Sequence, residues 1–268
     1  MSLFTHLCWD LFNRSFYKHE PSSIYVFGDS QLFRSLRIDQ KDYSFKMLSS
    51  SKHGAGIYDF LNFTKRVPEN SSIILQLPKL ILMRPKNLDR NDSGLLLSNI
   101  YLMWNNGYSI RDLWVITSKN FFPNRKWFHR NHDSYPCSTD LVNVEENRIK
   151  KIFSKLPNYF YDKENLFLEG ISILNKKNVK INFIELPFHP ELDSILYNSD
   201  VHLPIKESME SILNSSNKSL SIKTLELNNP SFYFHDWTHL NYCGASLVTP
   251  FVLSNLETNK YTFFRIIN

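Results

Sequence analysis

Several signatures of common binding sites are missing from this sequence. Its 268 residues contain no glycine-rich dinucleotide fingerprint, no phosphate-binding P-loop and no CxxC pair. These absences give no reason to expect a nucleotide cofactor or a zinc site. Only 7 glycines are present among many Asn, Lys, Ser and Ile residues, which indicates compositional drift rather than a special architecture.

Cysteine is also scarce, at three residues: Cys8, Cys137 and Cys243. Their number is odd and they lie far apart, so they match neither metal-ligand spacing nor a disulfide framework. We therefore expect three unpaired thiols in a reducing compartment.

Long apolar runs and long basic blocks are absent as well. The most apolar run, residues 73–83, contains Gln76, Pro78 and Lys79 and is too short to span a bilayer. The first 16 residues lack the basic start and unbroken apolar stretch of a signal peptide. A net charge of +5 without a Lys/Arg block gives no indication of nucleic acid as a partner. The expectation is a cytoplasmic protein without membrane insertion.

What is present is a globular composition, with 42% hydrophobic and 21% charged residues. Short β-rich runs alternate with helical patterns, which is typical of a parallel sheet covered by helices on both faces. We expect one three-layer α/β/α domain with a flavodoxin-like, mostly parallel central sheet over 23–268. A helical extension over 1–22 should precede it, and an excursion should lie near 118–147. Expected strands are 23–27, 43–48, 72–77, 113–117 and 179–186; expected helices are 31–38, 57–66, 93–105, 143–155, 163–176 and 242–253.

Residues able to perform acyl chemistry follow the first strand and precede the last helix. Ser30 comes directly after the strand 23–27, while Asp236 and His239 are three residues apart before the helix at 242. A serine becomes nucleophilic when a histidine takes its proton, and the histidine needs a carboxylate on its other nitrogen. Because active groups gather at the carboxyl ends of parallel strands, these residues are candidates for one site.

The motifs around these residues resemble those of the SGNH/GDSL hydrolases. Residues 27–30 (FGDS) are similar to the first sequence block of that family, and 236–241 (DWTHLN) with the following Gly-Ala at 244–245 to its last block. The likeness extends over about residues 23–254. It implies that Ser30 is the nucleophile and that Asp236 and His239 complete a triad. The alternative is that Ser30 only caps a helix and His239 is an ordinary loop residue.

The family's middle blocks are matched unevenly. Residues 51–59 resemble the second block, which implies that the backbone N–H of Gly54 joins that of Ser30 in an oxyanion hole. A tight turn is the alternative role for this glycine. The third block departs from the family, because Leu77-Pro78-Lys79-Leu80 stands where the family usually has Gly-x-Asn-Asp after such a strand. Gln76, Arg84 or Asn87 could replace the missing asparagine, and spacing does not choose among them.

Two further segments bear on the substrate. Residues 179–190 resemble a strand and loop of SGNH-like acyltransferases that modify polysaccharides, which makes His189 a candidate contact for an acyl donor or a sugar. An ordinary loop histidine is the alternative. The segment 119–132 mixes basic and aromatic residues and could bind a carbohydrate or the phosphate of a coenzyme A donor; a solvated loop is an equal alternative. Its histidines, His129 and His132, lack the further ligands of a metal site.

These features together predict a serine esterase or deacylase without cofactor or metal. Its expected substrate is an acylated carbohydrate or another small ester. One alternative is a carbohydrate O-acyltransferase that uses the same serine with a donor such as acetyl-coenzyme A. The other is a catalytically silent carbohydrate-binding protein, which the missing third-block asparagine favours.

Overall fold

The computed structural model describes most of the expected α/β domain. The described residues are 23–36, 46–49, 56–83, 137, 160–216, 219–228, 230–256 and 261–268. The expected N-terminal extension, the helices at 93–105 and 143–155 and the strand at 113–117 lie outside them. So does the excursion, apart from Cys137.

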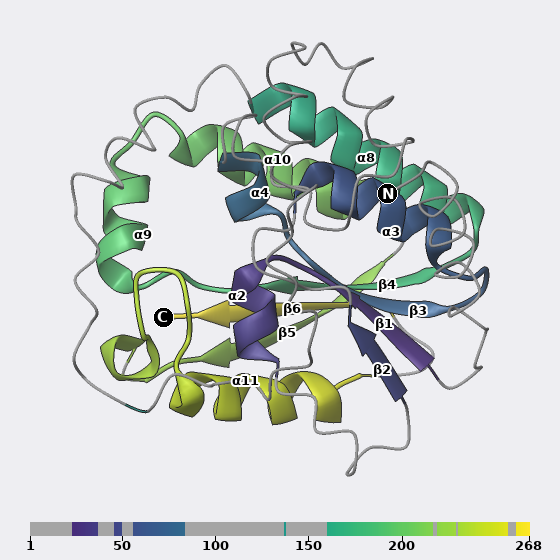
Figure 1. Ribbon diagram of the computed structural model, residues 1–268. Coiled ribbons are helices and arrows are strands. Elements are labelled where there is room, and N and C mark those ends of the chain that lie inside the picture. Colours follow the sequence, from purple (N-terminus) through teal and green to yellow (C-terminus); the bar gives the residue numbers. More distant parts are fainter. Residues whose placement is uncertain are drawn as a thin grey trace, which may run out of the picture.

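One parallel sheet organises the described part of the chain (Figure 1). Its strand order is β2-β1-β3-β4-β6-β5, and every pairing between the named strands is parallel. Neighbouring parallel strands place their carboxyl ends at the same edge, where β1 and β3 lead into the next segments. The strands are β1 (Ser23–Phe27), β2 (Lys46–Ser49), β3 (Ser72–Gln76), β4 (Lys180–Glu185), β5 (Leu220–Glu226) and β6 (Tyr261–Ile267).

Helices cover both faces of this sheet, as expected for a three-layer α/β/α domain. Figure 1 shows α3, α4, α8 and α10 on one face and α11 on the other, and α11 packs against α2. The helices are α2 (Ser30–Ser35), α3 (Ile57–Arg66), α4 (Lys79–Met83), α8 (Phe160–Lys176), α9 (Pro190–Tyr197), α10 (His202–Asn214) and α11 (Tyr242–Ser254), with the 3-10 turn η2 at Pro230–Tyr233.

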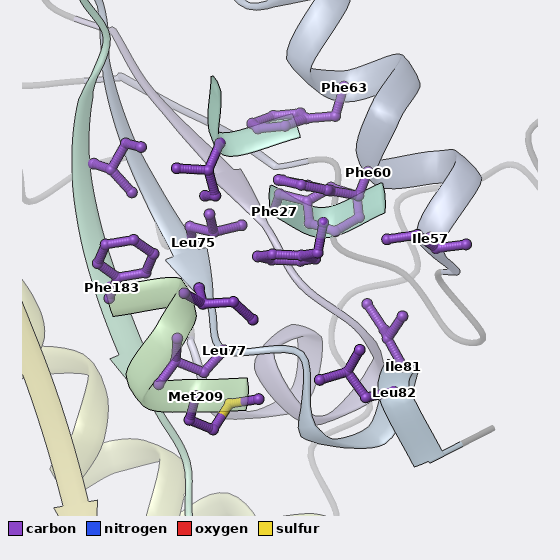
Figure 2. Close-up of a cluster of buried hydrophobic side chains, with 14 of the residues drawn as sticks. Phe27, Ile57, Phe60, Phe63, Leu75, Leu77, Ile81, Leu82, Phe183 and Met209 are labelled. Carbon is purple, nitrogen blue, oxygen red and sulfur yellow. The ribbon is translucent and has the colours of Figure 1, made fainter. Parts of the chain in front are cut away.

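Strands β1, β3 and β4 are buried on both faces because helices cover each side. In β1, Phe27 points into the larger apolar cluster beneath α3 and α8, while Val26 points into the cluster beneath α11. Figure 2 shows Phe27 beside Phe60 in the larger cluster, where the ring centroids are 5.3 Å apart. The Phe60 ring stacks on Phe167 of α8 at 4.0 Å. This packing fixes the end of β1 and therefore the position of the turn that follows it.

The structure contains two strands and three α-helices that the sequence analysis did not predict. Strands β5 and β6 and helices α4, α9 and α10 were not predicted. Strand β5 is an edge strand whose side chains are mostly exposed or half-buried, so no apolar run marks it. Helix α8 begins at Phe160, three residues before the expected start. Strand β2 spans Lys46–Ser49, one residue beyond its expected end, and residues 43–45 lie outside the described residues.

Candidate active site

The turn after β1 presents Ser30 at the start of a helix. Asp29 is the N-cap of α2, and its Oδ1 accepts the backbone N–H of Gln31 at 2.8 Å. An Asp at this position satisfies one of the backbone donors that a helix start leaves without an intrahelical partner. Ser30 is the first residue of the helix and is buried, with 7% of its surface exposed. The motif therefore does more than end a strand, because it holds the serine in the first turn of α2.

A second turn, between η2 and α11, holds the acid and the histidine. Asp236 Oδ1 accepts the backbone N–H groups of Thr238 at 2.8 Å and His239 at 2.9 Å. The ring Nδ1 of His239 lies 2.8 Å from Asp236 Oδ2. An Asp that binds the backbone two and three residues ahead forms a compact turn. This local geometry explains why a spacing of three residues aims both side chains at each other.

The two turns meet, although 209 residues separate Ser30 and His239. The Nε2 atom of His239 lies 2.9 Å from the Oγ atom of Ser30. Because Nδ1 faces the Asp236 carboxylate, we assign the ring proton to Nδ1, which leaves Nε2 to accept the serine hydroxyl. The three residues picked from the sequence thus form one continuous chain of hydrogen bonds.

The electrostatics of Asp236 suit this arrangement. Burial alone would raise the pKa of its carboxyl group, but hydrogen bonds and charge from His239 and backbone donors lower the pKa to about 2. The carboxylate is therefore ionised across the neutral range. An ionised acceptor holds the imidazole orientation and stabilises a positive charge that forms on the ring.

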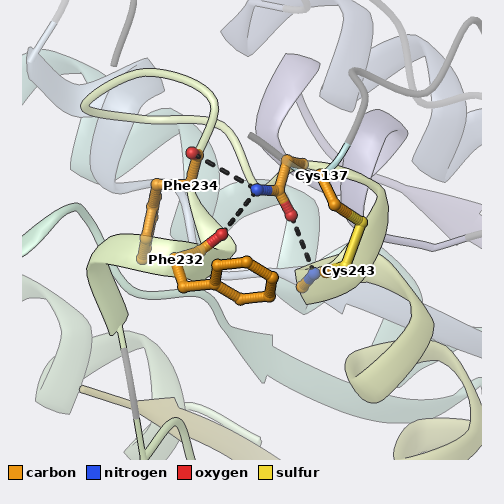
Figure 3. Close-up of a disulfide and its surroundings, with 6 residues drawn as sticks. Cys137, Phe232, Phe234 and Cys243 are labelled. Atoms are coloured by element: carbon orange, nitrogen blue, oxygen red, sulfur yellow. Dashed lines mark hydrogen bonds between the residues drawn. A yellow bond between two sulfur atoms is a disulfide. The ribbon is translucent and has the colours of Figure 1, made fainter. Parts of the chain in front are cut away.

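Asn241 connects this turn to α11. Its Oδ1 accepts the backbone N–H of Gly244 at 3.1 Å and caps the helix. Its Nδ2 donates to the carbonyl oxygens of Phe232 at 2.7 Å and Phe234 at 3.4 Å (Figure 3). One buried side chain thus holds both ends of the segment that carries Asp236 and His239. The sequence motif contained Asn241, but its structural role was not predicted.

The expectation of three unpaired thiols is wrong. Cys137 and Cys243 form a disulfide, with their Cα atoms 5.5 Å apart (Figure 3). Cys243 lies in the first turn of α11, so the bridge joins residue 137 to the helix that follows the Asp236–His239 turn. Spacing in the sequence gave no signal, because 106 residues separate the two cysteines and pairing cannot be deduced from spacing alone.

His189 lies beside the Asp236–His239 turn but outside the hydrogen-bonded chain. Its backbone N–H donates to the carbonyl of Trp237 at 2.9 Å, and its ring packs edge-on against Phe234. The ring Nδ1 caps α9 by accepting the N–H of Glu191 at 3.3 Å. Burial lowers the pKa of this histidine. Its buried Nε2 has no hydrogen-bond partner among the described residues.

The predicted oxyanion groups are only partly described. Gly54, Arg84 and Asn87 lie outside the described residues. Gln76, the remaining candidate for the third-block donor, is buried at the end of β3 and its side chain is engaged by the turn after β1. Its carbonyl oxygen accepts the backbone N–H of Asp29 at 2.9 Å.

A cavity of about 520 Å³ lies apart from the hydrogen-bonded triad. It is formed by α9, α10 and the ends of β4 and β6, and none of the three triad residues lines it. Leu77, Phe188 and Met209 form part of its apolar wall. Lys79 and Glu185 also line the cavity and form an ion pair with an N–O distance of 2.6 Å. The arrangement of Ser30 and His239 is therefore not inside this cavity.

Neither the protein-family models nor the curated proteins contain a match to this chain. The similarity to SGNH/GDSL hydrolases therefore rests on the motifs. Within the described ranges, no helix has both the length and the apolar character needed to cross a membrane.

Proposed function

We propose that this protein is a serine-dependent acyl-ester hydrolase. The observation that supports this proposal is the unbroken contact chain from Ser30 Oγ through the His239 ring to the Asp236 carboxylate, with distances of 2.9 and 2.8 Å. A helix-capping serine and an unrelated loop histidine would have no reason to meet at hydrogen-bond distance across the fold. An ionised Asp236 adds the charge that such a base requires.

In the proposed reaction, Ser30 Oγ attacks the ester carbonyl while His239 Nε2 takes the hydroxyl proton. The tetrahedral intermediate then expels the alcohol, which receives that proton from His239, and an acyl-serine ester remains. Water repeats the sequence with His239 as base, which releases the carboxylic acid and restores Ser30. The resemblance assigns the oxyanion to the backbone N–H groups of Ser30 and Gly54, and each donor of this kind contributes about 3 kcal/mol in the transition state.

An acylated carbohydrate remains the proposed substrate, and it comes from the resemblance of residues 179–190 to polysaccharide-modifying relatives. His189 is 2% exposed and its Nε2 is buried, so contact with a substrate would require this atom to become exposed. With Nδ1 accepting a backbone N–H, the neutral ring carries its proton on Nε2, which is a donor suited to an ester or sugar oxygen. Transfer of the acyl group to a sugar hydroxyl would use the same acyl-serine, so this alternative differs only in the acceptor.

The disulfide bears on location. A Cys137–Cys243 bridge favours an oxidising compartment over the cytoplasm that the sequence led us to expect, because cytosolic thiols are kept reduced.

Intact-mass analysis after reaction with a fluorophosphonate tests the proposal directly. Wild-type protein should gain the mass of one phosphonyl group, and Ser30→Ala should gain none. Ser35→Ala is the matched control, because Ser35 is a buried serine of the same helix whose hydroxyl donates to Gln31 O at 2.7 Å. It should be modified like the wild type. Equal modification of Ser30→Ala, or none in the wild type, would refute the serine site.

Turnover of a short p-nitrophenyl ester completes the test. Ser30→Ala should abolish turnover while the circular dichroism spectrum stays unchanged, since Ser30 is the first residue of α2 and lies outside the apolar clusters. Adding an acceptor oligosaccharide separates the two reactions: ester formation on the sugar indicates acyl transfer, and release of free acid alone indicates hydrolysis.

A further inference from the structure

Two buried glutamines form a relay of hydrogen bonds behind the nucleophile. The backbone N–H of Asp29 donates to Gln76 Oε1 at 2.9 Å. Gln76 Nε2 donates to Gln31 Oε1 at 2.9 Å, and Gln31 Nε2 donates to the carbonyl of Pro187 at 2.7 Å. The relay therefore connects the turn after β1, the end of β3, the first turn of α2 and the loop after β4.

The direction of this relay is determined by its ends. A backbone N–H can only donate, so Gln76 must present its oxygen to Asp29 and its amide nitrogen to Gln31. A backbone carbonyl can only accept, so Gln31 must present its nitrogen to Pro187. Both requirements agree with one amide orientation for each side chain, which removes the usual ambiguity of such groups. The amide oxygen and nitrogen of each glutamine thus have a partner, and a buried network of this kind favours one geometry.

The relay also fits tightly around the serine. Gln31, Gln76 and Asp29 are each at most 3% exposed. A Cβ atom placed on Gly28 would lie 2.5 Å from Gln76 Oε1, so glycine is the residue that lets this side chain approach the backbone. Ser30 stands between two members of the relay, Asp29 and Gln31. The relay therefore holds the backbone N–H of the residue before the nucleophile and the side chain of the residue after it.

We propose that Gln76 and Gln31 are positioning residues that hold Ser30 at hydrogen-bond distance from His239. This inference rests on the proposed serine chemistry. It also assigns a role to Gln76, one of the three candidates to replace the missing third-block asparagine: its side chain anchors the nucleophile turn. A misplacement of about 1 Å at a reacting group costs about 10²-fold in rate, so loss of the relay should be measurable.

The test compares methionine variants, because methionine keeps the length of glutamine and removes its hydrogen bonds. Gln76→Met, Gln31→Met and the double variant would be reacted with the fluorophosphonate, and the rate constant of Ser30 modification measured by intact mass. Each single variant should react about 10²-fold more slowly. The double variant should react no more than a few-fold more slowly than either single one, since residues of one network are not additive.

A buried amide at the other end of the sheet supplies the control. Asn182 is 1% exposed, and its Nδ2 donates to Ile73 O at 3.1 Å near the start of β3. Asn182→Leu should lower the melting temperature while leaving the modification rate constant at the wild-type value. Separate measurement of kcat and KM adds a second readout. With a p-nitrophenyl ester, Gln76→Met should lower kcat and leave KM within about two-fold of the wild-type value, because the substitution does not change ground-state binding of the substrate.

Partial rescue distinguishes positioning from general stability. Ionised Gln76→Glu keeps an oxygen acceptor for the Asp29 N–H but has no donor for Gln31, so its rate constant should fall between those of the wild type and Gln76→Met.

The outcomes separate this inference from the proposed function. A wild-type protein that is not modified at Ser30 refutes both. A reactive wild type with an equally reactive, folded Gln76→Met variant refutes the relay alone, and so does an Asn182→Leu variant slowed as much as Gln76→Met. If Gln76→Met does not fold, Gln31→Met carries the same test, and wild-type reactivity in that variant overturns the inference.

Discussion

Replacing Asn241 should weaken both the fold and the site, and the size of the effect can be worked out from its hydrogen bonds. The cap on Gly244 N–H contributes about 1 kcal/mol. The two bonds to the carbonyls of Phe232 and Phe234 contribute about 1 kcal/mol each. Asn241→Ala should therefore lower the free energy of unfolding by about 3 kcal/mol. At about 2–4 °C per kcal/mol for large domains, the melting temperature should fall by about 9 °C.

Asn241→Ser separates the two contributions. Serine is also a good N-cap, so this variant keeps the bond to Gly244 and loses the two bonds to the carbonyls. It should be about 2 kcal/mol less stable than the wild type and about 1 kcal/mol more stable than Asn241→Ala. Asn198→Ala is the control, because the exposed bond from Asn198 to Ser194 O should cost no more than about 0.5 kcal/mol.

Chemical unfolding followed by circular dichroism measures these values, and fluorophosphonate modification of Ser30 reports on the site. The rate constant should fall in both Asn241 variants, since the segment carrying His239 loses its anchor to η2. The reasoning is refuted if Asn241→Ala stays within about 0.5 kcal/mol of the wild type. It is also refuted if the serine variant is as unstable as the alanine variant, because the cap would then contribute nothing.

Three further predictions follow from the disulfide and from two pKa shifts. In denaturant without reductant, iodoacetamide should modify Cys8 alone, because Cys137 and Cys243 are paired; modification of all three thiols would exclude the bridge. Replacing the pair by serine should lower the free energy of unfolding by about 4.7 kcal/mol, the loop-entropy value for a separation of 106 residues. For Asp236, whose pKa is lowered from 3.8 to about 2, the ionised carboxylate stabilises the fold above pH 3.8, and this stabilisation is lost as pH falls through about 2. The stability of the wild type relative to Asp236→Asn should therefore decline by about 2 kcal/mol over this interval, and a pH-independent difference would contradict the shift. For His189, burial lowers the pKa below 6.5, so the unfolded chain takes up the proton first and acidification below about pH 6.5 lowers the free energy of unfolding. His189→Asn keeps a capping oxygen and should make this loss of stability with falling pH smaller. An unchanged slope of stability against pH would assign the loss to other groups.

The sequence predicted those parts of the fold and site that depend on local patterns. The apolar runs of β1, β3 and β4 marked buried strands, and all three are present within one or two residues of the expected bounds. The spacing of Asp236 and His239 predicted a turn because an Asp side chain can bind backbone groups two and three residues ahead, as it does here.

What the sequence could not predict depends on contacts between remote segments. The relay joins Gln31 to Gln76 and to Pro187, residues 45 and 156 positions away. Nothing in a local pattern distinguishes a glutamine in such a relay from a glutamine on a surface. The pairing of Cys137 with Cys243 could not be predicted for the same reason, because it is a contact between segments 106 residues apart. Strand β5 was missed for a different reason, since an exposed edge strand needs no apolar face.

The meeting of Ser30 and His239 depends on the packing of α2 against α11. Leu32 of α2 and Val248 of α11 belong to the same buried cluster, and Thr249 Oγ1 donates to Ser35 O at 3.2 Å. Helix α2 begins at Ser30 and α11 begins three residues after His239. The packing of the two helices against each other therefore sets the distance between Ser30 Oγ and His239 Nε2. The motifs therefore supply the chemical groups, and buried residues one to two turns away supply their alignment. A chain that kept both motifs but repacked this helix pair would retain the sequence signature without the site.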